Sequence, residues 1–341
     1  MPPVAVLADV VVVEVGQAIA GSVAGKVLAE SGARVVKAPL VALDREPAQV
    51  IAGFASWDRS KRVLAADGSA DDELLTLLDS ADVVIDQRWC GGRDRVAGAL
   101  EHVAVRDDVV LCRVATGLSL PAARLAVLDL ESLIGAASGV FATAISGQSL
   151  AGMAFVDVPV ASVAAGLHIA TAIAVALSAG APRVLDVAIT DVPSALKGVE
   201  FSRSEHLATV QATQIAASGV YRCADGEWIQ LDAPSLRMTA RLHGALDAAG
   251  CDLDGLDALL VPLVAVTPPQ AKAIRAALTA VFATRPADAW ERFLASSDVP
   301  CGRCRTPTEW FESELARACG AVRHRGDHGD SIRPEAGEVW R

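Results

Sequence analysis

The stretch VVVVEVGQAIAGSVAGKVLAESGARVVK, residues 10–37, decides the fold. Its β-branched run Val10–Val15 predicts a buried strand, and Ala20–Glu30 has the apolar spacing of a helix. Ala33–Lys37 then predicts a second strand. A strand, a helix and a strand of these lengths form one βαβ unit with parallel strands, so we expect an α/β protein.

The same alternation continues through the first half of the chain. Further strands are predicted at Asp82–Asp86, Val109–Val114 and Leu185–Ile189, because each is a short apolar run. Helical segments are predicted at Asp71–Ser80, at Arg93–Leu100 and twice within residues 128–177. Strands that are apolar on both faces indicate a parallel, Rossmann-like sheet with helices on both sides.

The second half of the chain has a different pattern. Residues 219–231 alternate β-forming and polar residues around Asp225-Gly226, which predicts a β-hairpin. Helices are expected at 236–249, 269–283, 287–295 and 307–318, with an extended segment at 299–304. We therefore expect a large domain over residues 1–195 and a smaller α+β domain over 196–310. Residues 311–341 would form a C-terminal helix and a tail that returns toward the large domain.

Composition excludes several classes of function. The chain has 30 Lys and Arg residues against 41 Asp and Glu, a net charge of −11, which speaks against a nucleic-acid partner. No uninterrupted apolar run approaches the roughly 20 residues that span a bilayer, and the N-terminus has no basic region typical of a secretion signal. Seven cysteines, an odd number, favour reduced thiols and a cytoplasmic protein. Cys301 and Cys304 have the spacing of a metal or redox pair, but no second pair accompanies them, so we expect no metal.

Several segments, in the same order, resemble the family III CoA-transferases, which include formyl-CoA and carnitine CoA-transferases and the 2-methylacyl-CoA racemases. They extend over about residues 9–312, and no single one is specific. They are residues 20–37, WDRSKR at 57–62, ADVVIDQRWCG at 81–91, LESLIGAASG at 130–139, PVASVAAGLH at 159–168, YRCADG at 221–226 and VPCG at 299–302. The resemblance implies a Rossmann-like large domain, a small domain and an interlocked homodimer.

The resemblance also implies that coenzyme A, as a substrate, binds against the first βα turn. The positions that match family CoA contacts are Ile19, Ala20, Arg59, Lys61, Arg62 and Gln87. Three of them form a basic cluster in an otherwise acidic chain, which fits a phosphate-bearing ligand. The alternative interpretation of this cluster is a solvated turn.

The chain departs from the family at the catalytic position. In the transferases an Asp attacks the acyl-CoA thioester and carries the acyl group as an anhydride, but an ungapped match of residues 164–168 places Ser162 there. Asp157 is the nearest carboxylate in sequence, and Glu131 matches an acidic family position near the reacting groups. The racemases also need a His, at a position occupied near Leu130 in this chain. His168 we interpret as a structural helix residue.

Two functions therefore remain open. One is an enzyme that acts on acyl-CoA, either by moving CoA to a carboxylic acid through Asp157 or Glu131 or by another reaction on the thioester, such as racemisation or hydrolysis. The other is a catalytically degenerate homologue that binds acyl-CoA or pairs with an active paralogue. An NAD-dependent dehydrogenase is disfavoured, because the glycines at 16, 21 and 25 lack the G-x-G-x-x-G spacing and no acid follows the second strand.

Overall fold

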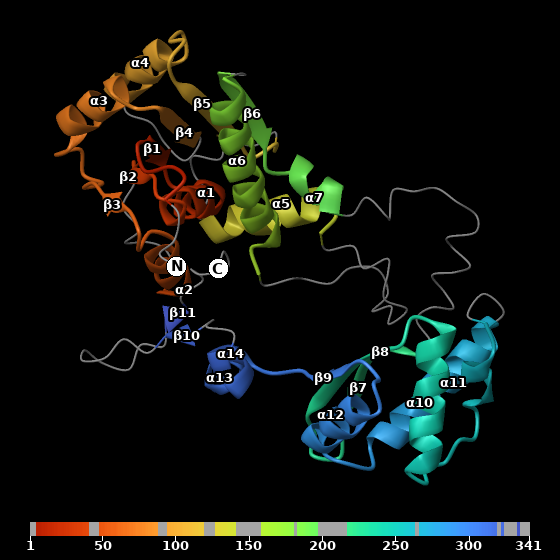
Figure 1. Ribbon diagram of the computed structural model, residues 1–341. Coiled ribbons are helices and arrows are strands. Elements are labelled where there is room, and N and C mark those ends of the chain that lie inside the picture. The colour runs from red at the N-terminus through yellow and green to blue at the C-terminus, as the bar shows by residue number, and fades with distance from the viewer. Residues whose placement is uncertain are drawn as a thin grey trace. The chain divides into compact units, whose positions relative to one another are not determined.

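The computed structural model describes residues 5–40, 48–87, 94–118, 127–140, 158–180, 183–196, 217–262, 266–318, 322–323 and 333–334. They fall into two compact units, shown in Figure 1. The large unit contains the described residues up to 140, those from 158 to 196 and those from 314 onward. The small unit contains residues 217–313, apart from 263–265.

A parallel sheet with strand order β3-β2-β1-β4-β5-β6 forms the centre of the large unit. The strands are β1 (Val11–Gly16), β2 (Arg34–Ala38), β3 (Arg62–Val63), β4 (Val83–Gln87), β5 (Val110–Ala115) and β6 (Val184–Ala188). The expected parallel, Rossmann-like sheet is confirmed. The order reverses between β1 and β4, which lie side by side although β2 follows β1 in the chain.

Helices flank this sheet. They are α1 (Ile19–Glu30), α2 (Ala48–Trp57), α3 (Asp71–Asp79), α4 (Asp94–Val103), α5 (Val127–Ala137), α6 (Val160–Ala179) and α7 (Asp191–Leu196). Apolar residues of α1 and α6 share one core with the strands, whereas α3 and α4 belong to another core with alternate strand residues. The helices therefore cover opposite faces of the sheet, as continuous apolar strands require. The sequence patterns did not indicate α2 or the two-residue strand β3.

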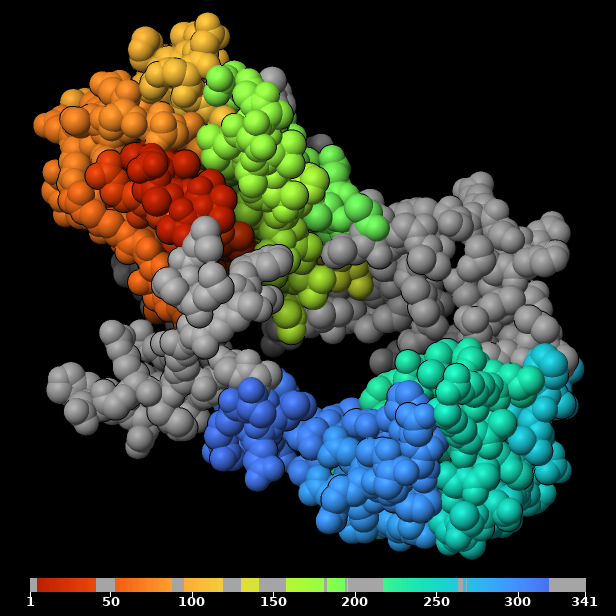
Figure 2. All heavy atoms as spheres, in the orientation of Figure 1, coloured from red at the N-terminus to blue at the C-terminus, as the bar shows by residue number. Residues whose placement is uncertain are grey.

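Helix α6 packs closely against α1. A Cβ at Gly166 would lie 2.6 Å from the carbonyl oxygen of Ala20, so only glycine permits this approach. The helix is apolar on all sides, with Ala165 and Ile169 buried but Leu167 and Val175 exposed. Figure 2 shows its side chains, in green, along the surface of the large unit.

By length and composition alone, α6 is long and apolar enough to cross a membrane. The sequence-based expectation that no segment approaches this limit is therefore too strict. Ser162 and His168 interrupt the apolar run, and its buried face packs in the core around Ile169 and Ile173. A core helix meets the same criteria.

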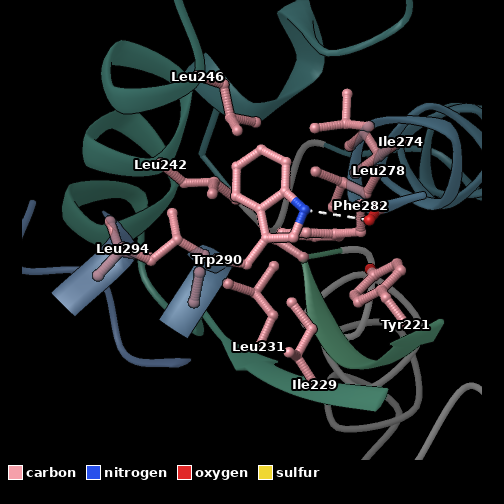
Figure 3. Close-up of a cluster of buried hydrophobic side chains, with 14 of the residues drawn as sticks. Tyr221, Ile229, Leu231, Leu242, Leu246, Ile274, Leu278, Phe282, Trp290 and Leu294 are labelled. Atoms are coloured by element: carbon pink, nitrogen blue, oxygen red, sulfur yellow. Dashed lines mark hydrogen bonds between the residues drawn. The ribbon is translucent and has the colours of Figure 1, made fainter. Parts of the chain in front are cut away.

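The small unit contains an antiparallel sheet of β7 (Ser218–Arg222), β8 (Trp228–Asp232) and β9 (Cys301–Arg303). Helices α10 (Leu236–Ala248), α11 (Pro268–Phe282) and α12 (Ala287–Ser296), with the 3-10 turn η3 (Asp257–Leu260), complete it. Trp290 is fully buried at its core and donates its Nε1 hydrogen to the carbonyl oxygen of Phe282 at 3.0 Å (Figure 3). The predicted hairpin is confirmed, with Gly226 at a φ of +85° in its turn.

The C-terminal region begins with α13 (Pro307–Glu312) and α14 (Glu314–Ala318). The strands β10 (Val322–Arg323) and β11 (Arg333–Pro334) pair with each other. The single helix expected at 307–318 is divided into α13 and α14, because Ser313 adopts an extended conformation between these two helices.

Candidate functional site

The first turn of α1 lies where β1 and β4 end. Gly16 closes β1 at a φ of +102°, and a Cβ there would lie 2.6 Å from the carbonyl oxygen of Gln87. The backbone amide of Gly21 donates to Oε1 of Gln87 at 2.8 Å. This is the point where the strand order reverses, and open α/β sheets bind ligands outside the strand ends at such a point.

Three of the predicted CoA-contact positions meet at this helix start. Ile19 and Ala20 begin α1 and are buried, and Ile19 packs in a small cluster with Val23, Phe54 and Val163. Gln87 is fully buried, and its Nε2 has no hydrogen-bond partner among the residues that the structure describes. A buried amide donor that lacks an acceptor carries a free-energy cost. The Gln87 side-chain amide at the start of α1 is therefore a candidate donor to a ligand oxygen.

Lys61 points into the protein. Its Nζ donates to Oε2 of Glu14 at 2.7 Å, to Oδ1 of Asp58 at 2.8 Å and to the carbonyl oxygen of Ser22 at 2.8 Å. An ammonium group has three hydrogens, and these contacts occupy all of them. The phosphate contact of Lys61 stays a prediction. In this conformation the Lys61 ammonium group has no N–H donor left for a phosphate.

A second lysine completes what we call the Glu14 cluster: Glu14, Ser22, Lys37, Asp58 and Lys61. Lys37 is the register partner of Glu14 on the neighbouring strand, and its Nζ lies 2.8 Å from Oδ2 of Asp58. Burial alone would raise the pKa of Glu14, but the two ammonium groups outweigh it and lower that pKa. The cluster holds two positive and two negative charges, so it is a neutral, closed network that ties β1, β2 and α1 to the turn after α2.

The two arginines of the predicted basic cluster point toward different helices. Arg59 lies 3.4 Å from Oε1 of Glu30 on α1, and Arg62 lies 2.5 Å from Oε1 of Glu73 on α3. The three cations of residues 57–62 therefore do not form one patch.

Lys26 is a residue that the sequence analysis missed. Its Nζ lies 3.8 Å from the same Glu30 oxygen that Arg59 approaches, and burial lowers its pKa. Lys26 and Glu30 are four residues apart on α1, a spacing that could have indicated the pair. Lys26 and Arg59 therefore bring two cations to one carboxylate beside α1.

Ser162 and Glu131, both predicted catalytic residues, lie in direct contact. The Ser162 hydroxyl donates to Oε2 of Glu131, and the Ser162 backbone amide lies 3.4 Å from Oε1. Ser162 is 4% exposed, at the third residue of α6, and Glu131 comes from α5. Burial raises the pKa of Glu131, although its hydrogen bonds with Ser162 and with the Ala161 amide act in the opposite direction.

The pair lies on the side of α6 that approaches α1. Ser162 is four residues before Gly166, so both occupy the same face of the helix, and Gly166 contacts Ala20. Val163, its neighbour, packs against Ile19. Two of the predicted catalytic residues, Ser162 and Glu131, therefore lie near the predicted CoA-contact positions Ile19 and Ala20.

Within the described residues, no other residue considered in the sequence analysis adds a catalytic group to this pair. His168 is exposed on α6, which agrees with its interpretation as a helix residue, and Leu130 is buried. Asp157 lies outside the described residues. Burial raises the pKa of the Cys301 thiol to about 12, and the described residues contain no group of three or more side chains that could hold a metal ion.

The arrangement around Ser162 suits acid–base or nucleophilic chemistry. It places a hydroxyl on a carboxylate that has neutral hydrogen-bond donors, and no ion pair to a described cation neutralises that carboxylate. Such a carboxylate accepts a proton more readily than one paired with cations.

Comparison with known proteins gives the family. Rv3272 from Mycobacterium tuberculosis, in its orthorhombic form, matches with 22% sequence identity and a TM-score of 0.70 over 97% of this chain and 92% of that chain. A CAIB/BAIF family protein from Brucella suis matches with 18% identity and a TM-score of 0.70 over 96% of this chain and 94% of that chain. These likenesses show the fold. No curated protein matches the sequence. The model of CoA-transferase family III matches residues 7–337, so the chain belongs to CoA-transferase family III.

Proposed function

We propose that the large unit binds an acyl-CoA and acts on its thioester at the Ser162–Glu131 pair. Membership of CoA-transferase family III supports acyl-CoA handling. The observation that carries the finer proposal is the hydrogen bond between Ser162 and Glu131. It supplies a carboxylate beside the position at which the ungapped match expects the family's Asp.

The nucleotide part of CoA would bind along α1. Support comes from the Gln87 amide that lacks an acceptor and from the two cations, Lys26 and Arg59, that share Glu30. Charge-assisted hydrogen bonds to phosphate would favour these cations, and the N-terminal amides of α1 favour an anion at its start. Ile19 and Ala20 would contact the ligand at that helix start. The exposed side chain of Arg62 pairs with Glu73 through one of its five N–H donors, and its contact with a phosphate stays a prediction.

The family description implies transfer of CoA to a carboxylic acid. Such a transfer passes through an anhydride on an enzyme carboxylate, which in the described residues only Glu131 could offer at this position. Asp157 stays a prediction for the same role.

A catalytically degenerate member that only binds acyl-CoA is the second candidate. The specific observation in its favour is that Glu131 accepts from the backbone at the start of α6, as a residue that caps a helix does. The homodimer that the resemblance implies stays a prediction. The cytoplasmic location stays a prediction.

Binding and turnover can be tested on the same sample. Isothermal titration with CoA and with acetyl-CoA should show saturable binding that weakens in Arg59→Ala but not in Arg237→Ala, an exposed arginine of the small unit. Incubation with acetyl-CoA and a panel of carboxylic acids, followed by mass spectrometry of the CoA pool, should show loss of acetyl-CoA. Absence of binding at millimolar CoA would contradict the proposal, and binding without turnover would establish the degenerate member.

A further inference from the structure

We infer that Ser162 is the attacking nucleophile and Glu131 its base, so that the large unit hydrolyses acyl-CoA to a carboxylic acid and CoA. This inference rests on the proposed acyl-CoA binding. It differs from CoA transfer because the acyl group is held as a serine ester and not as an anhydride.

The direction of the hydrogen bond identifies the attacking atom. A serine hydroxyl has one proton and two lone pairs, and the Ser162 proton points to Oε2 of Glu131. The other carboxylate oxygen, Oε1, accepts from the Ser162 amide. Both oxygens of Glu131 are thus engaged, whereas the Ser162 hydroxyl oxygen accepts no hydrogen bond from the described residues.

Glu131 has the environment of a base. Its burial raises its pKa, and the described ion pairs include none that joins Glu131 to a lysine or arginine. A serine hydroxyl needs such an adjacent base to attack a thioester. His168, the nearest histidine in sequence, is exposed on another face of α6, so Glu131 is the acceptor that the helix packing provides.

The helix end adds a favourable electrostatic contribution. Ser162 is the third residue of the 20-residue helix α6, whose N-terminal end carries a partial positive charge. Negative charge that develops on the Ser162 oxygen during attack is stabilised there.

The reaction balances with water as the co-reactant. The Ser162 oxygen forms a bond to the thioester carbon while its proton moves to Glu131. The carbon–sulfur bond then breaks, and the CoA sulfur takes the proton from Glu131. Water attacks the resulting ester, one water proton passes through Glu131 to the Ser162 oxygen, and the acid leaves. Return of the acyl group from a serine ester to CoA is uphill, so water is the favoured acceptor.

The test is acyl-enzyme trapping on the full chain. Wild-type protein is mixed with acetyl-CoA, quenched in acid within one turnover and mapped by peptide mass spectrometry, while free thiol is followed in parallel. We expect one acetyl group on Ser162, free acetate as product and no dependence on an added carboxylic acid. Ser162→Ala should abolish the adduct, and Glu131→Gln should lower thiol release by about 10²- to 10⁴-fold, the usual contribution of a general base.

Several outcomes overturn the inference, and they distinguish its failure from the failure of the proposed function. An adduct on Glu131, or thiol release that requires an added acid, establishes transfer through an anhydride. Titratable acetyl-CoA binding with no adduct and no thiol release establishes a binding protein. Loss of binding in the wild type contradicts the proposed function itself. The wild-type mapping decides among these even if a variant fails to fold.

Discussion

Two carboxylates of the large unit, the buried Glu14 and the partly buried Glu131, differ in what surrounds them. Glu14 is completely buried between Lys37 and Lys61, and those cations lower its pKa. Glu131 has only hydroxyl and amide donors, and burial raises its pKa. The difference shows how one fold can hold a carboxylate fixed in its charged form and keep another able to exchange a proton.

The comparison separates stability from chemistry. Removing one member of a buried charge cluster leaves the others uncompensated, so the Glu14 cluster should control folding. The Ser162–Glu131 pair contains a single charge with neutral partners, so its loss should affect the reaction more than the fold.

The largest stability effect is expected for Glu14→Gln. The substitution leaves two buried ammonium groups with one carboxylate, which should lower the free energy of unfolding by about 3–5 kcal/mol. Urea unfolding followed by circular dichroism measures the change. Glu101→Gln, at an exposed glutamate of α4, is the control and should unfold like the wild type. Equal stability of the two variants would contradict the role of the cluster.

A smaller effect, on ligand affinity, is expected for Arg59→Ala. Arg59 lies between the anchored residues Asp58 and Lys61, but its own side chain reaches α1. Loss of one charge-assisted hydrogen bond should weaken CoA binding by roughly ten- to a hundredfold without changing the unfolding midpoint. Lys61→Met should instead lower the unfolding midpoint, because the Lys61 ammonium group is buried in the Glu14 cluster. Titration calorimetry and thermal unfolding on both variants check this, and reduced stability in Arg59→Ala alone would contradict it.

Two of the buried serines, Ser162 and Ser22, allow the two carboxylates to be compared by removal of a single hydroxyl group. Ser162→Ala removes one neutral donor from Glu131, which keeps its backbone donor, and should cost about 1 kcal/mol of stability. Ser22→Ala removes the hydroxyl that accepts from Lys37 and donates to Glu14, so it should cost more, about 1–3 kcal/mol. Urea unfolding of both variants in one buffer decides the order. A costlier Ser162→Ala would assign the Ser162–Glu131 pair a structural role.

The smallest effect is the pH dependence of stability. The pKa of Glu131 is raised above its usual 4.5, so its contribution to stability is full below pH 4.5 and is lost as the pH rises through the folded-state pKa. The pKa of Glu14 is lowered, so its contribution is present above pH 4.5 and is lost as the pH falls through the folded-state pKa. The stability difference between wild type and each Gln variant, measured across this range, should therefore change in opposite directions.

Much of the fold could be predicted because its signals are local. The strand Val83–Gln87 and the helix Asp71–Asp79 lie within one residue of the ranges expected from apolar periodicity. Helix α2 was not expected, since AQVIAGFASW has no clear periodic face, and β3 contains only two residues. The order of the strands along the chain did not determine their order in the sheet, because the order in the sheet depends on how the crossover helices pack.

The sequence indicated which residues belong to the candidate site, but it did not indicate which of them contact one another. Ser162 and Glu131 were both named from the sequence, but they are 31 residues apart and meet only because α5 lies beside α6. The segment WDRSKR suggested a basic cluster for a phosphate, with a solvated turn as the alternative, whereas Lys61 donates to Glu14 on β1 and to the Ser22 carbonyl on α1. Burial of a lysine depends on partners distant in sequence, so no local pattern indicates it.

The most direct test of the central contrast compares Glu14→Gln and Glu131→Gln side by side. For each variant, the unfolding free energy and the rate of thiol release from acetyl-CoA are measured in the same buffer at neutral pH. The account predicts that Glu14→Gln loses stability, whereas Glu131→Gln remains as stable as the wild type to within about 1 kcal/mol and loses thiol release. A Glu131→Gln variant that unfolds as easily as Glu14→Gln, or that releases thiol at the wild-type rate, would contradict it.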